Sequence, residues 1–329
     1  MNLARFAAFG VALAGLALAG PAEAQDRSGW PQSLKVGTAS QGGTYFIYGA
    51  GWAGLVQEML GVNTSTEATG GPVQNMALVH NGDLDFAMTT MGPAYDAWTG
   101  QSPLAPGVEM KDVRATFPMY QTPFHIVTLQ SSGIDSVEEL AGKKVGLGPR
   151  GGTPGTVFPK IFADVGIEID PQYGGASDLA GQLQDGLIDA FAFAAGLPIA
   201  AFSQVEAQAP VNFFSFTDEQ LQTILEANPA LSAYTIPGDT YRSMGDDQET
   251  VAMWNFGIVH KDMPEDLVYE VMKTVLDNPD RMAAIHSAAA ETVPEAYDKN
   301  NFLWFHPGAI RYYREKGLEL GENVIPPEA

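Results

Sequence analysis

The sequence predicts an α/β protein with two doubly wound domains, and two observations carry this prediction. Four glycine pairs each stand where a short β-like run gives way to a helical pattern. They are residues 42–43, 70–71, 151–152 and 174–175. The two halves also share one plan, since Gly82 and Gly186 end the helical patterns that follow the second pair of each half. Short parallel strands joined by helical crossovers form a doubly wound sheet.

The first half opens with the β-like run 34–38, which leads into the first glycine pair. Apolar or small residues then recur three or four positions apart at 46, 49, 53, 56 and 60, which predicts one face of a helix. The glycines at 49, 51 and 54 match G-x-G-x-x-G. They lie inside this helical pattern rather than at a strand-to-helix turn, so we interpret them as helix-packing glycines.

The second half repeats this order, with a run at 144–147 before the third glycine pair and a strand at 185–191 after the fourth. Segment 117–123 contains two prolines and predicts the crossing into the second domain. A return crossing is expected within 251–260, before helices at 264–276 and 309–316 that would pack on the first domain. The predicted domains are 25–120 plus 261–329, and 121–260.

The composition excludes several functions. The 329 residues include 39 Asp and Glu, 17 Lys and Arg, and no Cys, for a net charge of -22. Disulfides, thiol nucleophiles, Cys-ligated metals and thioether lipid anchors are therefore excluded. So strong an acidity argues against a nucleic-acid partner. The five His are scattered and favour structural roles, so we expect neither a metal nor a cofactor.

Residues 1–24 have the pattern of a cleavable signal peptide. Arg5 gives a small positive region, an apolar run follows, and Ala22-Glu23-Ala24 is a small-x-small cleavage site. The apolar run is too short for a membrane-spanning helix, which needs about 20 residues. We therefore expect a periplasmic protein that is not lipidated and that acts as a monomer.

The candidate binding site follows from the glycine loops. A glycine before a helix leaves backbone N–H groups and the positive end of the helix dipole open to an anion, whereas a tight turn is the alternative for any single pair. Pairs from both domains would face each other across a cleft. Polar side chains at these helix starts either cap the helix or contact a ligand. The candidate ligand-binding residues are Ser40, Gly43, Thr44, Tyr45, Gly71, Asn75, Thr90, Tyr120, Arg150, Gly151, Gly152, Thr153 and Phe193.

Arg150 is the one Lys or Arg beside a glycine pair, so it is either a carboxylate partner or a solvated loop arginine. In the first role, its loss should weaken binding by about 2 kcal/mol or more. Catalytic signatures are weak, because neither a Gly-x-Ser-x-Gly elbow nor a His-Glu-x-x-His motif occurs. We expect a binding protein rather than an enzyme.

Several ordered motifs over nearly the whole mature chain resemble the solute-binding subunits of TRAP transporters, TAXI subfamily. They include the segments at 37–46, 69–76, 139–145, 185–191, 195–198, 234–241 and 306–317. The resemblance implies a type II periplasmic binding protein fold that closes on a small organic anion and delivers it to a membrane permease. Glutamate, 2-oxoglutarate and C4 dicarboxylates are the ligand classes it implies.

Two departures from the family pattern bear on the ligand. Arg150 precedes Gly151-Gly152-Thr153 where a Gly-Ser-Gly-Thr turn is common, and Thr122 stands near the place of an expected acidic residue. Both favour a dicarboxylate or 2-oxoacid over an amino acid. Two alternatives stay open: a protein of the same fold that serves an ABC importer or sensor kinase, and a periplasmic enzyme acting on an anionic substrate.

Overall fold

A computed structural model describes residues 27–327. The chain divides into two units, residues 1–30 and 31–329. In the described part of the first unit, the Arg27 guanidinium lies 4.7 Å from the centre of the Trp30 ring. The predicted signal peptide lies outside the described residues. The remaining description concerns the second unit alone.

The second unit contains a ten-stranded sheet. The strands are β1 (Ser33–Gly37), β2 (Asn63–Glu67), β3 (Phe86–Thr90), β4 (Val113–Leu129), β5 (Lys144–Gly146), β6 (Asp170–Gln172), β7 (Ala190–Ala194), β8 (Val211–Phe214), β9 (Ser232–Ile236) and β10 (Gln248–His260). The α-helices are α1 (Thr44–Leu60), α2 (Pro72–His80), α3 (Met91–Trp98), α4 (Thr153–Asp164), α5 (Ala176–Gln184), α6 (Ala200–Glu206), α7 (Asp218–Ala227), α8 (Glu265–Leu276), α9 (Pro279–Ile285) and α10 (Pro307–Glu315). Short 3₁₀ helices are η1 (Gln130–Ser132), η2 (Glu138–Leu140), η3 (Ser287–Glu291), η4 (Pro294–Lys299) and η5 (Glu322–Val324).

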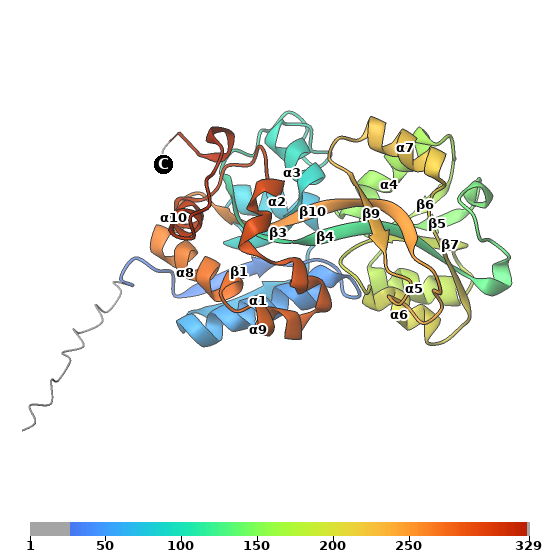
Figure 1. Cartoon of the computed structure of the whole chain (residues 1–329), viewed down its shortest axis with the longest axis horizontal. Coiled ribbons are helices and arrows are strands. Elements are labelled where there is room, and N and C mark those ends of the chain that lie inside the picture. Colours follow the sequence, from blue (N-terminus) through green and yellow to red (C-terminus); the bar gives the residue numbers. More distant parts are fainter. Residues whose placement is uncertain (1–26, 328–329) are drawn as a thin grey trace, which may run out of the picture. The chain divides into compact units, whose positions relative to one another are not determined.

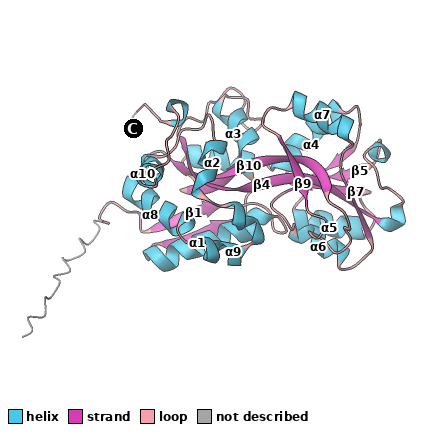
Figure 2. Ribbon diagram, in the orientation of Figure 1, coloured by secondary structure: helices cyan, strands magenta, loops and turns pink. Residues whose placement is uncertain are grey.

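The sheet has the same strand order in its two halves. The full order is β2-β1-β3-β10-β4-β7-β5-β6, with β8 on β4 and β9 on β10. Read from each edge towards the centre, the first half is β2-β1-β3 and the second half is β6-β5-β7. In the first half, β1 pairs in parallel with β2 and β3; in the second half, β5 pairs in parallel with β6 and β7. The predicted repeat is therefore confirmed. Helices cover both faces of the sheet (Figure 2).

Strands β4 and β10 connect the two halves and run antiparallel to each other across the centre of the sheet (Figure 1). The predicted crossings at 117–123 and 251–260 both lie inside these long strands. Pro118 faces Phe256, where the register shifts on both sides, as expected for a proline that cannot donate to a regular ladder. The domain limits at 120/121 and 260/261 stay a prediction.

Helix α1 forms where the apolar periodicity predicts it, with one difference. Gly49, Ala53, Val56 and Leu60 are buried, whereas Phe46 is 36% exposed. Tyr45, Tyr48 and Trp52 complete the buried face instead. The glycines of the G-x-G-x-x-G sequence lie inside the helix: a Cβ on Gly49 would meet Thr38 and Met88, and one on Gly51 would meet Ile285. Two of these glycines thus permit close packing.

The C-terminal helices return to the first half of the sheet, as predicted. Helices α8 and α9 contact α1, and α10 packs on α8 (Figure 1). Among the described residues, no helix combines the length and the apolar character needed to span a bilayer.

Candidate functional site

Four helices begin around one cavity of about 40 Å³ between the two halves of the sheet. Helices α1, α3 and α4 follow strands β1, β3 and β5, and α2 follows the edge strand β2. Because these strands are parallel within each half, their carboxyl ends share one edge. The residue that precedes each of the four helices lines the cavity. These N-cap residues are Gly43, Gly71, Thr90 and Gly152.

None of these four N-cap residues accepts a hydrogen bond from its own helix through a side chain. Three of them are glycines, which have no side chain that could do so. The first-turn N–H groups of a helix have no intrahelical acceptor, and the helix dipole adds a partial positive charge at the same end. At α2 and α3 most of these groups are absent or engaged: Pro72 and Pro93 have no N–H, the Val73 N–H donates to the carbonyl oxygen of Gly151, and the Gly92 N–H donates to the sulfur of Met253. The electropositive backbone at the cavity therefore comes chiefly from the starts of α1 and α4, one helix from each half of the sheet.

The glycine pairs of the two halves face each other, as predicted. A Cβ built on Gly71 would lie 3.1 Å from the Cα of Gly152, and one on Gly70 would lie 3.7 Å from the Cα of Gly151. A Cβ on Gly42 would lie 2.6 Å from the hydroxyl of Ser177, just after the fourth pair. The distances at Gly42 and Gly71 leave no room for a side chain, so glycine at these two positions lets the halves approach this closely.

Hydrogen bonds also join the halves around the cavity. The hydroxyls of Thr90 and Thr153 lie 2.6 Å apart, and the Thr44 hydroxyl donates to the carbonyl oxygen of Gly196 at 2.5 Å. The Val73 N–H donates to the carbonyl oxygen of Gly151 at 3.0 Å. The structure is thus a closed conformation. The hydroxyls of Thr44 and Thr153 bridge the halves rather than cap their own helices.

A buried polar group on the connecting strands completes the lining. Asn255 of β10 accepts from the Tyr45 hydroxyl at 2.6 Å and donates to the Thr122 hydroxyl at 2.7 Å. Its amide also donates to the carbonyl oxygen of Tyr120 at 2.5 Å. Burial raises the pKa of Tyr45 well above its ordinary value, so the phenol stays neutral. This network leaves the Thr122 hydroxyl proton available to an acceptor in the cavity.

The cavity includes many of the residues that the sequence nominated. Those that line it are Ser40, Gly43, Thr44, Tyr45, Gly71, Thr90, Gly152, Thr153 and Phe193. The remaining lining residues are Ala39, Gly70, Pro72, Thr122, Pro149, Pro154, Ala194, Ala195 and Asn255. Every residue in the lining is uncharged.

Four nominated residues are not among those that line the cavity. Asn75 is buried, and its amide donates to the carbonyl oxygens of Thr38 and Met88, which braces the ends of β1 and β3. Tyr120 packs edge-on against Tyr48, with ring centres 5.1 Å apart. The carbonyl oxygen of Gly151 accepts from Val73.

Arg150 lies on the surface. Its guanidinium is 3.8 Å from the centre of the Tyr173 ring, and the residue is exposed. In this closed conformation the cation is therefore engaged outside the cavity.

Sequence reasoning missed Asn255 and Thr122 as lining residues. Asn255 lies in an apolar strand pattern, and a polar residue in such a run was the one available signal. Thr122 stood out only as a departure from the family pattern.

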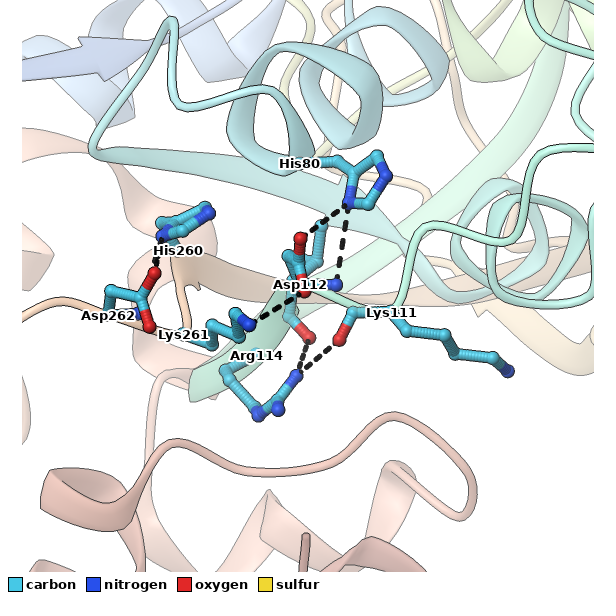
Figure 3. A network of polar contacts seen from close by, with 8 residues as sticks. His80, Lys111, Asp112, Arg114, His260, Lys261 and Asp262 are labelled. Carbon is cyan, nitrogen blue, oxygen red and sulfur yellow. Dashed lines mark hydrogen bonds and ion pairs between the residues drawn. The ribbon is translucent and has the colours of Figure 1, made fainter. Parts of the chain in front are cut away.

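The histidines have structural partners. His80 lies 3.7 Å from the Asp112 carboxylate, and Lys261 pairs with the same carboxylate at 3.2 Å (Figure 3). This cluster adjoins the start of β4 and the end of β10, whereas the cavity lies by Asn255, further back along β10. His286 and His306 accept backbone N–H groups at the starts of η3 and α10. Within residues 27–327, no group of three or more acidic or His side chains could hold a metal ion.

Residues 36–317 match the model of the NMT1-like family. The chain belongs to the NMT1-like family. Among solved structures, this NMT1-like protein is similar to the periplasmic binding protein BugD, with a TM-score of 0.55 and 14% identity over 88% of this chain and 99% of that one. A putative L-cystine ABC transporter protein from Listeria monocytogenes gives a TM-score of 0.49 and 16% identity over 79% and 96% of the two chains.

The NMT1-like protein has the fold of type II periplasmic binding proteins, as predicted. Two similar half-sheets, connected by β4 and β10, hold the cavity at their shared edge.

Proposed function

We propose that this NMT1-like protein is a periplasmic solute-binding protein that captures a small organic anion when its two halves close. The observation that carries this proposal is the meeting of four helix N-termini, α1 to α4, in one cavity with an uncharged lining. Backbone N–H groups at helix starts bind carboxylates well, because the helix dipoles add to the hydrogen bonds.

The cavity offers recognition without acid–base chemistry. Tyr45 is the one ionisable side chain in its lining, and the raised pKa of its buried phenol keeps it protonated. General acid–base catalysis needs a group that can exchange a proton near neutral pH. These facts favour binding over an enzymatic role.

For delivery, we propose a TRAP-type membrane permease driven by an ion gradient, because the sequence motifs resemble that class. An ABC importer or a sensor kinase is the alternative. Uptake measured in membrane vesicles from the source organism, with and without added binding protein, separates the two classes of transporter. Uptake should follow a sodium or proton gradient without ATP, whereas strict ATP dependence would contradict the TRAP proposal.

Ligand capture is tested by thermal unfolding of mature protein that has been refolded free of bound solute. The panel pairs each carboxylate with its neutral amide, for example pyruvate with pyruvamide and succinate with succinamide. It also includes glutamate, 2-oxoglutarate, phosphate and sugars. A ligand at a hundredfold excess over its Kd adds about 2.7 kcal/mol to folding stability, which raises the midpoint by several degrees. A shift with at least one carboxylate and not with its amide supports the proposal, and no shift with any anion contradicts it.

A further inference from the structure

We infer that the captured anion is a monocarboxylate of two to four carbon atoms, and that Phe193 sets this length limit. The inference rests on the proposed function and narrows its ligand class. Three features of the closed cavity carry it: its uncharged lining, its volume and the position of the Phe193 ring.

The charges favour a ligand with one carboxylate and no amine. The starts of α1 and α4 can take up a single carboxylate through backbone N–H groups, while the dipoles of α2 and α3 add positive potential. A second carboxylate would need a cation, and the lining contains no Lys or Arg. An ammonium group would need an acceptor carboxylate, and the lining contains no Asp or Glu. A second charge enclosed without a partner costs several kcal/mol.

Three charged side chains of neighbouring segments are engaged elsewhere. Arg150 stacks on Tyr173, and Lys160 of α4 pairs with Asp96 of α3 at 3.5 Å. Glu291 accepts the Gln121 N–H at 2.7 Å. None of these side chains belongs to the lining, so none supplies a counter-charge there in the closed state.

The volume favours a short ligand. A cavity needs about 10–15 Å³ to hold one water molecule, so the 40 Å³ available corresponds to about three. Acetate and pyruvate, with four and six non-hydrogen atoms, are close to this size. Five-carbon acids such as glutamate and 2-oxoglutarate have ten non-hydrogen atoms and would hold the halves apart.

Phe193 limits the cavity on the side of α1. A Cβ built on Gly43, the N-cap of α1, would lie 3.6 Å from the edge of the Phe193 ring. The other edge of the ring lies against Gly148, at 2.6 Å from a Cβ built there. The ring is thus fixed between the two halves. Its removal would lengthen the cavity and leave the helix starts in place.

Phe191 provides a matched control. Its ring centre lies 5.3 Å from that of Phe193 on the same strand, and it is fully buried. It does not belong to the cavity lining. Phe191→Ala therefore removes the same atoms from the core without lengthening the cavity.

The experiment measures Kd by titration calorimetry for the parent protein, Phe193→Ala and Phe191→Ala. The probes are acetate, pyruvate, 2-oxobutyrate, 2-oxohexanoate, 2-oxoglutarate and glutamate. Phe193→Leu is measured as well, as a smaller change that preserves folding. For the parent protein we expect the tightest binding with pyruvate or another acid of two to four carbons, and at least about 100-fold weaker binding of 2-oxoglutarate and glutamate.

Phe193→Ala, or Phe193→Leu to a smaller extent, should shift the preference towards 2-oxohexanoate by at least tenfold, whereas Phe191→Ala should leave the preference unchanged. Tighter binding of glutamate or 2-oxoglutarate by the parent protein would overturn this inference and leave the proposed function standing. An unchanged length preference in both Phe193 variants would overturn the role of Phe193. If no carboxylate binds, the proposed function itself fails.

Discussion

Replacement of Gly71 by alanine should block closure, and Gly82, just beyond the other end of α2, offers a control. Both glycines have positive φ, +105° and +74°. Alanine costs about 1–2 kcal/mol of folding stability in the left-handed region, and it costs more at Gly71, whose ψ of −159° belongs to a region that is essentially restricted to glycine. The two sites differ in their surroundings. A Cβ on Gly71 would lie 3.1 Å from the Cα of Gly152 and 3.4 Å from the carbonyl oxygen of Gly151, whereas nothing lies within 4 Å of a Cβ on Gly82.

Favourable carbon contacts occur at about 3.5–4.0 Å, so the new methyl group forces the halves apart by several tenths of an ångström. Overpacking of this kind costs about 1–3 kcal/mol, and here the cost falls on the closed form alone. Gly71→Ala should therefore bind roughly 5- to 150-fold more weakly than Gly82→Ala. Calorimetric titration with the carboxylate that binds the parent protein most tightly measures this ratio, and thermal unfolding confirms that both variants fold. Equal affinities within twofold would refute the closed interface as the binding state.

Three further predictions follow from the contacts around the cavity and the core. Thr153→Val removes the hydrogen bond to Thr90 and should weaken ligand binding about fivefold, whereas Thr156→Val, whose hydroxyl bonds only carbonyl oxygens beside it, should not. Arg150→Ala should leave Kd within twofold, since the cation stacks on Tyr173; a roughly 30-fold loss, about 2 kcal/mol, would instead support the carboxylate role predicted from sequence. Burial lowers the pKa of His125 to about 3. As the pH falls below about 6.5, the imidazole of His125 therefore takes up a proton in the unfolded chain and not in the folded protein. The free energy of unfolding then decreases by about 1.4 kcal/mol per pH unit down to pH 3. Urea unfolding at pH 7 and pH 5 should show roughly 2 kcal/mol more loss for the parent protein than for His125→Phe, and equal losses would contradict the neutral, buried histidine.

Sequence patterns predicted the parts of the fold that depend on local periodicity and glycine placement. The repeat of strand, glycine loop and helix was sufficient to predict matching half-sheets, and Gly71 and Gly152 do meet as expected. Buried side chains that depend on long-range packing were harder to interpret. Phe46 follows the helical period yet is exposed, because Tyr45 and Tyr48 occupy the buried face.

The sequence predicted the parts of the candidate site that depend on helix starts and strand ends. It did not predict the parts that depend on tertiary contacts. Thr90, Thr153 and Phe193 line the cavity, since helix starts and strand ends can be located from sequence. Arg150 follows the same sequence logic, yet its side chain turns to Tyr173, a partner 23 positions away that no local pattern indicates. Asn255 enters from the return strand, and its place depends on the pairing of β10 with β4.

The starts of α1 and α4, where glycine is the N-cap residue, have a consequence for mutational studies of this protein. Main-chain amides persist through almost every substitution, so an alanine scan of the proposed site would report on the fit of the closed halves more than on contacts with the anion. Replacing single amides by esters, at Thr44 or Thr153 for example, would remove an N–H group and keep the side chain. Substitutions of the lining side chains can therefore change which ligand such a site selects. The main-chain N–H groups that bind the carboxylate are kept, because side-chain substitutions do not remove them.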